Sequence, residues 1–457
     1  MSRVAIVGAG LSGLVAAHDL RRLLGADSAI DLYDSADRVG GLLHGVDVAG
    51  RTTDVGAEAF VLRRPEAHDL VVELGLADEL VVPTGARPAV WAGGRRHRLP
   101  APAWMGIPAS AEAVRGLADD ADVARMESEP TRPLHWTRGS DCSLGELVAD
   151  RFGPSVVARS VDPMIGGVYA CLAADTGVRA AMPALAARLD DGAPSLTAAV
   201  EALLPPAGAE QPPVFGALRG GYGRLVAALV ESGAPTLNLN TPVGPIARIA
   251  GVWAVGAETY DAVVVATPAP VAATQLEQIA PASAESLAQI ETASSAVVAL
   301  AVDASVPVPD LSGVLAATGD ELARGVCANP AKAITLSSRK WPHYRDSAAL
   351  RMRVSFGRLG EPVIASDEEL VTAAVAAVGQ VCGEEIGERL IDAAVQHWPG
   401  GLPCYAPGHQ ARARAVIDGL PPGIVVAGSA YNGVGVPACI AQARSAAAAV
   451  DARIAAR

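Results

Sequence analysis

The sequence predicts an α/β fold built around a parallel sheet, with α+β and helical segments inserted into it. Three observations support this prediction. An apolar, largely β-branched run at residues 4–7 leads directly into a glycine pattern at residues 8–13. A second apolar strand, residues 29–33, ends on an aspartate. A strand, a glycine-rich loop and a helix recur near the C-terminus, at residues 423–449.

The first glycine pattern stands where a dinucleotide-binding turn requires it, and it reads Gly8-Ala9-Gly10-Leu11-Ser12-Gly13. Its glycines permit a tight turn, close approach to a pyrophosphate and close packing of helix on strand. The apolar residues that follow recur at helical spacing, so the first N–H groups of that helix should face the phosphates. Asp34 lies 34 − 13 = 21 residues after Gly13, near the ~20 expected for a ribose-binding carboxylate. We therefore expect a Rossmann-type domain here.

The composition limits the function classes. The chain has 457 residues, 51% of them hydrophobic and 19% charged, enough for two or three domains with large cores. A net charge of −13 argues against nucleic acid and anionic lipid as partners. The six cysteines form no C-x-x-C pair, and the histidines show no metal spacing, so neither a disulfide framework nor a metal site is expected.

The predicted nucleotide-binding domain is discontinuous, with segments 1–90, 214–290 and 397–457. The middle segment should contain a helix after Gly220–Gly223, hairpin-like strands at 237–239 and 246–255, and a central parallel strand at 261–266. Residues 91–213 are expected to form a mostly helical insert. Residues 291–396 begin and end with strand-like stretches and are expected to form an α+β substrate domain.

The residues after Asp34 indicate which dinucleotide binds. Ser35, Arg38, Gly40, Gly41 and Leu42 extend the predicted contact along the pyrophosphate. This arrangement resembles the flavin-containing amine oxidase superfamily, which implies FAD as the cofactor. The next part of that pattern is a loop expected to approach the flavin, and its members are Gly56, Ala57, Glu58 and Ala59.

Within that superfamily, nearly the whole chain resembles the protoporphyrinogen/coproporphyrinogen oxidases. The carrying motifs are Phe60–Pro65, Glu73–Leu76, Leu99-Pro100, Met105–Pro108, Gly166–Tyr169 with Met182-Pro183, Gly220–Gly223, Val265–Pro268, Trp398 with Leu402-Pro403 and Tyr405, and Ala427–Ile440. The chain departs from the family pattern at Cys171, Gly177 and Cys404. These departures lie outside the flavin motifs, so they affect only the expected shape of the substrate side.

The resemblance also implies roles for residues far from the N-terminus. Val243 would present its backbone to the adenine, and Trp398 would wall the flavin, with a buried structural tryptophan as the alternative. The C-terminal loop would reach the flavin through its backbone, and its members are Gly428, Ser429, Val434, Gly435 and Val436.

On the substrate side, Arg63 and Arg64 follow the flavin-facing loop, so one of them could bind a propionate bidentately. The alternative is that both extend from a helix start into solvent. The run Arg95–Arg98 is expected to be a solvated hairpin. No general base is evident, and no catalytic residue is assigned.

The resemblance implies oxidation of a porphyrinogen to a porphyrin in heme synthesis, with oxygen as acceptor and hydrogen peroxide as product. Because no membrane-docking face is evident, coproporphyrinogen III, a tetracarboxylate, is favoured over protoporphyrinogen IX. A flavin amine oxidase, a carotenoid desaturase and a non-enzymatic escort protein remain alternatives, and handover of product to a ferrochelatase is left open. The N-terminus starts directly with a strand, and no run reaches the ~18 residues of a membrane span, so a cytoplasmic protein is expected. Peripheral docking through an expected helical segment, residues 104–117, stays open.

Overall fold

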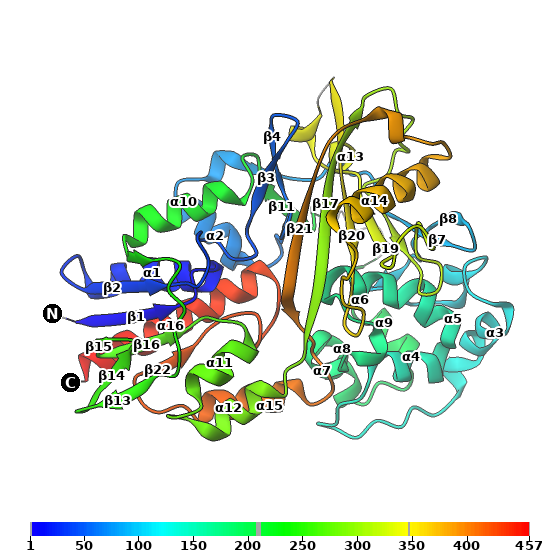
Figure 1. Ribbon diagram of the computed structural model, residues 1–457. Helices are drawn as coiled ribbons and strands as arrows, with labels where there is room; N and C mark the ends of the chain where they lie inside the picture. Colours follow the sequence, from blue (N-terminus) through cyan, green and yellow to red (C-terminus); the bar gives the residue numbers. More distant parts are fainter. Residues whose placement is uncertain (1, 207–211, 346–347, 457) are drawn as a thin grey trace.

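The computed structural model describes residues 2–206, 212–345 and 348–456. Its nucleotide-binding region is built on a five-stranded parallel sheet of order β12-β2-β1-β16-β22. The strands are β12 (Thr236–Asn238), β2 (Ala29–Tyr33), β1 (Arg3–Val7), β16 (Ala262–Val265) and β22 (Ile424–Val426). Figure 1 shows these strands, which come from the start, middle and end of the chain, lying side by side. The discontinuous α/β region predicted from the sequence is thus present.

The two faces of this sheet are covered differently, because successive side chains of a strand point to opposite faces. Val4 and Ile6 pack against helices α1 (Leu11–Leu24), α2 (Pro65–Glu73), α10 (Tyr222–Gly233) and α16 (Val436–Ala455). Ala5 and Val7 pack on the other side, against a small antiparallel sheet and helices α11 (Ala269–Leu276) and α12 (Pro281–Ala288). That small sheet consists of β13 (Ala247–Ile249), β14 (Val252–Val255) and β15 (Glu258–Tyr260).

A second, seven-stranded sheet has the order β21-β17-β20-β19-β18-β7-β8. Its strands are β21 (Leu390–Pro403), β17 (Thr292–Asp303), β20 (Ala349–Phe356), β19 (Ala331–Thr335), β18 (Gly313–Ala316), β7 (Ala89–Ala92) and β8 (Arg95–Arg98). Helix α14 (Asp367–Cys382) covers one face and starts with a capping box of Ser366 and Glu369. The other face meets the hairpin β3 (Gly45–Val48) and β4 (Arg51–Asp54), so it faces the nucleotide-binding region.

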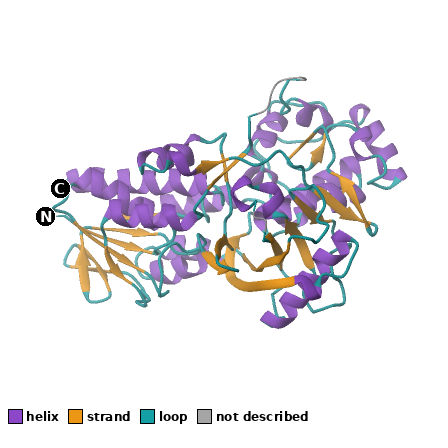
Figure 2. Ribbon diagram, turned by 90° about the horizontal axis from the view of Figure 1, so that it is seen from above, coloured by secondary structure: helices purple, strands orange, loops and turns teal. Residues whose placement is uncertain are grey.

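A helical region packs beside this sheet (Figures 1 and 2). Its helices are α3 (Asp120–Ser128), α4 (Leu144–Phe152), α5 (Pro154–Val156), α6 (Asp162–Tyr169), α7 (Val178–Ala181), α8 (Pro183–Asp190) and α9 (Leu196–Glu201). They share one apolar core, into which Cys404 and Tyr405 from the end of β21 also pack. The chain segment that follows β21 is therefore fixed by the helical region. Among the helices that the structure describes, none is both long and apolar enough to cross a bilayer.

Two predictions of local structure were wrong. Residues 237–239 were expected in a hairpin. The chain instead forms β12 there, which pairs in parallel with β2, because helix α10 carries the chain back to the end of the sheet at which β2 begins. Residues 104–117 were expected to be helical. They contain the short hairpin β9 (Ala103–Trp104) and β10 (Ile107–Pro108), then a single 3-10 turn, η2 (Ala111–Val114).

The hairpin β7–β8 crosses the predicted boundary at residue 90. Its strand β7 pairs in parallel with β18, so the hairpin extends the sheet formed by the 291–396 segment. Local sequence cannot show such a pairing, because the partner strand lies more than two hundred residues away. The boundaries of the three predicted segments stay a prediction.

Candidate flavin site

The structure brings the two N-terminal glycine segments into contact. The N–H of Gly40 donates to the carbonyl of Ala9 (2.8 Å), and Gly40 bridges Gly10 as a parallel β-bridge. Gly10 is the N-cap of α1, and Leu11 and Ser12 open its first turn. The first N–H groups of an α-helix have no partner within the helix, so this end of α1 can bind an anion. The segments predicted to hold one pyrophosphate therefore lie together.

The space around the glycines tests whether a dinucleotide fits. A Cβ at Gly8 would lie 2.6 Å from the Ala266 carbonyl oxygen, and one at Gly13 would lie 1.9 Å from the Gly8 carbonyl oxygen. These two glycines are therefore required for backbone packing. A Cβ at Gly10 meets only the Gly41 Cα, at 3.9 Å, and one at Gly428 meets nothing within 4 Å. The latter two glycines border open space, which fits a cradle for a phosphate-bearing cofactor.

Asp34 is held at the carboxyl end of β2, beside the glycine turn. One carboxylate oxygen accepts from the Ala9 N–H (2.7 Å) and the other from the Ala36 N–H (2.9 Å). Ser35, the next residue, is exposed. The position of Asp34 fits its predicted contact with a ribose, and the contact itself stays a prediction.

Arg38 and Trp398 lie against one another. The Arg38 guanidinium donates to the Gly41 carbonyl (3.0 Å) and lies 5.8 Å from the centre of the Trp398 ring. Burial lowers the pKa of Arg38, although Asp37 and Asp34 act in the opposite direction. Arg38 is half-buried and forms no ion pair with a carboxylate among the described residues, so its guanidinium is suited to a phosphate.

The loop predicted to face the flavin is fixed by Trp398 and by the glycine turn. The indole N–H of Trp398 donates to the Val55 carbonyl (2.9 Å), and the Ala57 N–H donates to the Leu42 carbonyl (3.2 Å). A Cβ at Gly56 would lie 1.8 Å from the Leu42 carbonyl oxygen, so only glycine fits there. Trp398 thus has a structural hydrogen bond in addition to its predicted place beside the flavin.

Glu58 belongs to a buried ion cluster that the sequence did not reveal. Its carboxylate accepts from the Lys340 amine (2.6 Å) and lies 3.6 Å from the Arg353 guanidinium, which also donates to the Gly56 carbonyl (2.7 Å). Burial would raise the pKa of Glu58, but the charges of Lys340 and Arg353 outweigh it and lower the pKa to about 2. The side chain of Glu58 therefore anchors the loop to β20, while the neighbouring Ala59 packs in a small apolar cluster.

The C-terminal loop is shaped by Tyr405. Its hydroxyl donates to the Ser429 carbonyl (2.6 Å) and accepts from the Gly433 N–H (2.6 Å), and its ring stacks on His409 with centroids 3.9 Å apart. Tyr405 belongs to a motif of the predicted family resemblance, which implied no role for it. Its two half-buried backbone partners lie 24 and 28 residues away, so local sequence does not reveal them.

Three further predicted residues complete this loop. Gly435 is the N-cap of α16, Val436 is its first residue, and Val434 packs against the core of the helical region. A second helix N-terminus therefore lies at the end of the loop. Val243 lies between β12 and β13, and its carbonyl accepts from the Gln275 amide (3.2 Å).

The predicted propionate ligands lie at the start of α2. Arg64 is the N-cap residue of α2 and pairs with Glu66, and Arg63 is exposed. Burial raises the pKa of Cys439 to about 11, against the opposing charge of Arg64, so Arg64 acts on the first turn of α16. Whether either arginine contacts a substrate stays a prediction.

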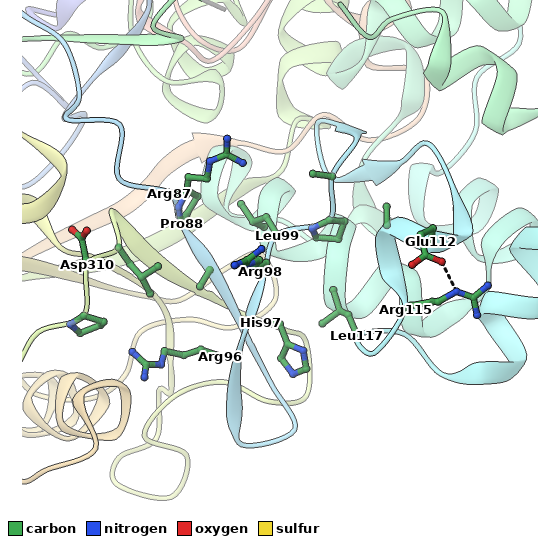
Figure 3. Close-up of a pocket in the computed structure, with 16 residues that line it drawn as sticks. Arg87, Pro88, Arg96, His97, Arg98, Leu99, Glu112, Arg115, Leu117 and Asp310 are labelled. Atoms are coloured by element: carbon green, nitrogen blue, oxygen red, sulfur yellow. Dashed lines mark hydrogen bonds and ion pairs between the residues drawn. The ribbon is translucent and has the colours of Figure 1, made fainter. Parts of the chain in front are cut away.

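A basic cavity of about 1010 Å³ lies between β7–β8, η2 and residues 309–311 (Figure 3). Arg115 on its wall is paired with Glu112 (2.6 Å). Among the ion pairs of the described residues, none involves Arg87, Arg96 or Arg98, the other arginines of the wall. The Arg95–Arg98 run, expected as a solvated hairpin, thus forms strand β8 and contributes to a cationic surface.

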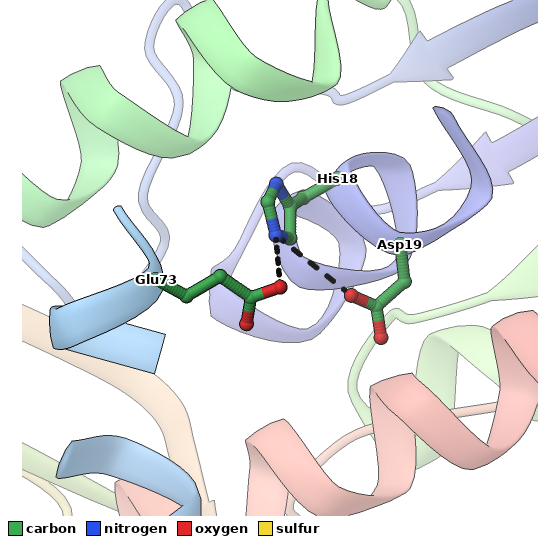
Figure 4. A group of neighbouring side chains, drawn as sticks. All are labelled: His18, Asp19 and Glu73. Atoms are coloured by element: carbon green, nitrogen blue, oxygen red, sulfur yellow. Dashed lines mark ion pairs between the residues drawn. The ribbon is translucent and has the colours of Figure 1, made fainter. Parts of the chain in front are cut away.

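A second cluster of titratable groups lies in the nucleotide-binding region (Figure 4). One nitrogen or oxygen of each of His18, Asp19 and Glu73 lies within 4.8 Å of the others. Arg444 donates to Glu73 (2.6 Å), and Arg22 also contacts that carboxylate. Since guanidinium groups already balance the acidic charge, we assign this cluster to the packing of α1, α2 and α16.

The fold and these residues define a flavoprotein oxidoreductase. A family model described as flavin containing amine oxidoreductase matches residues 11–451, and the chain belongs to this family. Its cofactor is FAD, as the glycine segments and Arg38 predicted. Bound FAD supplies the hydride-accepting chemistry, while the residues above would orient it.

The chain is also similar to individual known proteins over nearly its full length. The coproporphyrinogen III oxidase of Mycobacterium leprae (strain TN) is 46% identical over 457 residues, covering 98% of each chain. That of Mycobacterium bovis is 45% identical over 445 residues, covering 96% of this chain and 95% of the relative. A solved structure from Exiguobacterium sp. 255-15, described provisionally as a protoporphyrinogen oxidase, has a TM-score of 0.85 at 27% identity and covers 99% of each chain. Cyclohexylamine oxidase of Brevibacterium oxydans shares the fold, with a TM-score of 0.70 at 15% identity over 99% of each chain.

Proposed function

We propose that this protein oxidises coproporphyrinogen III to coproporphyrin III, with FAD as the hydride acceptor and oxygen as the final acceptor. The observation that carries the proposal is the 46% identity, over 98% of both chains, to a relative named coproporphyrinogen III oxidase. In each two-electron step a bridge carbon loses a hydride and a pyrrole nitrogen loses its proton. Oxygen then takes up two electrons and two protons to give hydrogen peroxide.

The basic cavity supports a substrate with several carboxylates. Arg87, Arg96 and Arg98 offer guanidinium groups in a chain whose net charge of −13 otherwise repels anions. Coproporphyrinogen III has four carboxylates and protoporphyrinogen IX has two, so this cationic surface favours the former. We place the reaction in the cytoplasm and propose a ferrochelatase as the class of partner that takes the porphyrin.

The test offers both porphyrinogens to the FAD-loaded protein, in air and without oxygen. Porphyrin fluorescence, peroxide and bleaching of the flavin absorption are followed together. Coproporphyrinogen III should be oxidised faster, with peroxide formed in air and flavin reduction alone without oxygen. If an amine reduces the flavin and neither porphyrinogen becomes fluorescent faster than the uncatalysed control, the proposal is wrong.

Arginine variants test how the carboxylates are recognised. Arg98→Ala should raise KM for coproporphyrinogen III about tenfold, since one charge-assisted contact contributes roughly 1.5–3 kcal/mol. Arg63→Ala and Arg64→Ala test, in the same assay, the prediction that one of these arginines binds a propionate. A larger KM increase for coproporphyrinogen than for protoporphyrinogen would support this role. Arg138→Ala, an exposed residue elsewhere in the helical region, serves as the control.

A further inference from the structure

Lysine is rare in this chain: one lysine lies in β19 and the other ends the short helix α13 (Ser337–Lys340). Lys332 and Lys340 stand among 36 basic residues, so arginine provides nearly all positive charge. Lys340 pairs with Glu58 at the flavin-facing loop. Lys332 has no comparable carboxylate within salt-bridge distance among the described residues, and its amine donates to the carbonyl of Gly357. The neutral amine has two N–H groups and one lone pair, so beside its bond to Gly357 one N–H and the lone pair remain.

Lys332 occupies a bulge in the seven-stranded sheet. Along the β19–β20 ladder, Ala331 pairs with Phe356 and Ala333 pairs with Ser355, so Lys332 is the extra residue. Such a bulge turns a side chain away from the regular alternation and is common beside active sites. The Leu359 N–H, two residues after Gly357, donates to the carbonyl of Ala170 at the end of α6 (2.8 Å), so Lys332 lies beside the end of that helix.

Helix α6 lies on the face of the sheet opposite α14, because Leu315 alternates with Val314 and Ala316, which both belong to the core under α14. Helix α6 packs against β18 and β19, yet Gly167 is exposed and Val168 is 39% exposed. A Cβ at Gly167 would lie 3.8 Å from a methyl of Leu315 on β18. An exposed apolar surface between packed elements is the environment that a flat macrocycle requires.

Lys332 also lies close to the predicted flavin wall. A Cβ on Gly357, which accepts from the amine, would lie 3.4 Å from the Cα of Ser295. Ser295 on β17 is paired with Trp398 on β21. Two strand spacings of about 4.8 Å therefore separate Gly357 from Trp398. Trp398 packs with Val55 and Val297 on the face opposite α14, which is also the face that α6 covers beside Lys332.

We propose that Lys332 is the proton acceptor for the substrate's pyrrole N–H, which deepens the function proposed above and rests on it. When a bridge C–H bond breaks and its electron pair leaves as hydride to the bound flavin, the adjoining pyrrole becomes a cationic, acidic N–H. That N–H bond then breaks, its electron pair stays on nitrogen, and the proton goes to the neutral amine of Lys332. The ammonium returns the proton to solvent before the next two-electron step.

The charges around Lys332 suit this task. Burial lowers the pKa of Lys332 to about 8, and the positive charge of Arg358 adds to that effect, while Cys171 and Glu361 oppose it. The elements packed around it add two carboxylates. Asp162 on α6 accepts from the Ala173 N–H (2.8 Å) and the Thr318 hydroxyl (2.8 Å), and Glu321 lies 3.5 Å from Arg358. A substantial fraction of the amine is therefore neutral near pH 8, as a proton acceptor must be.

The first test measures the amine without turnover. Because the chain has only two lysines, ¹³Cε-lysine labelling of the FAD-loaded protein gives two lysine signals, and Lys332→Arg identifies the Lys332 signal by its loss. The Lys332 signal should titrate near pH 8 and shift when coproporphyrin III is added. Titration above pH 10, or no response to the porphyrin, would overturn the proposal.

The second test compares two variants in the oxidation assay. In the wild-type protein kcat should rise with pH through about 8, because the amine must lose its proton before it accepts one. Both Lys332→Met and Lys332→Arg should lower kcat by about 100-fold or more and abolish this rise. Cys171→Ala should keep the rise of kcat with pH, which would show that the neighbouring thiol is not the source of this rise.

Two results separate this inference from the proposed function. If Lys332→Arg keeps the wild-type kcat and Lys332→Met changes only KM, then Lys332 is a cation that binds a substrate carboxylate, and it is not the proton acceptor. If the wild-type protein oxidises no porphyrinogen at all, the proposed function itself fails, whatever the lysine titration shows.

Discussion

The indole N–H of Trp398 donates to the carbonyl of Val55 (2.9 Å), across 343 positions of sequence. This bond joins the end of the second sheet to the loop that is predicted to face the flavin. Arg38 lies over the same indole ring from the nucleotide-binding region. One tryptophan therefore connects the second sheet, the predicted flavin-facing loop and the predicted pyrophosphate-binding turn.

Substitution by alanine should have different effects at two glycines of the first turn: at Gly10 it should weaken FAD binding, and at Gly13 it should lower stability. Gly10→Ala places a Cβ in open space, so the apoprotein should keep its Tm while FAD binding weakens at least tenfold. Gly13→Ala places a Cβ 1.9 Å from the Gly8 carbonyl oxygen, so it should lower Tm by several degrees or prevent folding. Thermal unfolding of the apoproteins and FAD titration measure both effects. Equal FAD affinity of Gly10→Ala and wild type would contradict the predicted close approach.

Asp34→Ala should raise the Kd for FAD about 10- to 100-fold. The carboxylate would lose its predicted ribose contacts and its bond to the Ala9 N–H, and a charge-assisted hydrogen bond contributes roughly 1.5–3 kcal/mol. Quenching of FAD fluorescence by apoprotein measures the affinity. Asp37→Ala, at an exposed position of the same loop, is the matched control and should bind FAD as wild type does. An Asp34→Ala protein purified with full flavin content would be evidence against the ribose contact.

Asp54→Asn should change how stability depends on pH. Burial raises the pKa of Asp54 from 3.8 to about 7, although its bond from the Tyr222 N–H (3.1 Å) opposes this. The folded chain therefore retains a proton that the unfolded chain releases, so this contribution to stability is full below pH 3.8 and is lost as pH rises to about 7. Asparagine does not ionise, and the Tm advantage of the variant should grow by about 2 °C or more between about pH 5 and pH 8. Asp47→Asn, on the exposed side of the same hairpin, should show a pH-independent difference.

Tyr405→Phe should loosen the C-terminal loop. Loss of the hydroxyl leaves the Gly433 N–H and the Ser429 carbonyl, which are both half-buried, without this partner, at a cost of roughly 0.5–1.5 kcal/mol for each lost hydrogen bond. We expect a lower Tm and an FAD Kd about tenfold higher. Tyr431→Phe is the control, because the Tyr431 hydroxyl is buried without a hydrogen-bond partner among the described residues. Similar FAD affinity for the two variants would show that the bridge does not shape the cofactor site.

Local sequence was sufficient for the nucleotide-binding elements. The strand at residues 29–33, the helix after Gly10 and the position of Asp34 follow from apolar periodicity and glycine spacing, which depend on neighbouring residues only. It was not sufficient for residues 104–117, for which a helical segment is expected, whereas the chain forms a hairpin and one 3-10 turn there. Short apolar runs do not distinguish the two structures, because their outcome depends on what they pack against.

The sequence by itself determined the parallel sheet, the glycine turn and, through Arg38, Gly40 and Gly41, the choice of FAD. Only the tertiary structure decided that Lys340 and Arg353 neutralise Glu58, that Tyr405 bridges the C-terminal loop, and that Lys332 is the extra residue of a bulge beside the end of α6. The physical reason is that strand periodicity and glycine turns arise within a few residues. Ion pairs, backbone bridges and bulges instead require a partner strand or loop whose position is set by the packing of the entire chain.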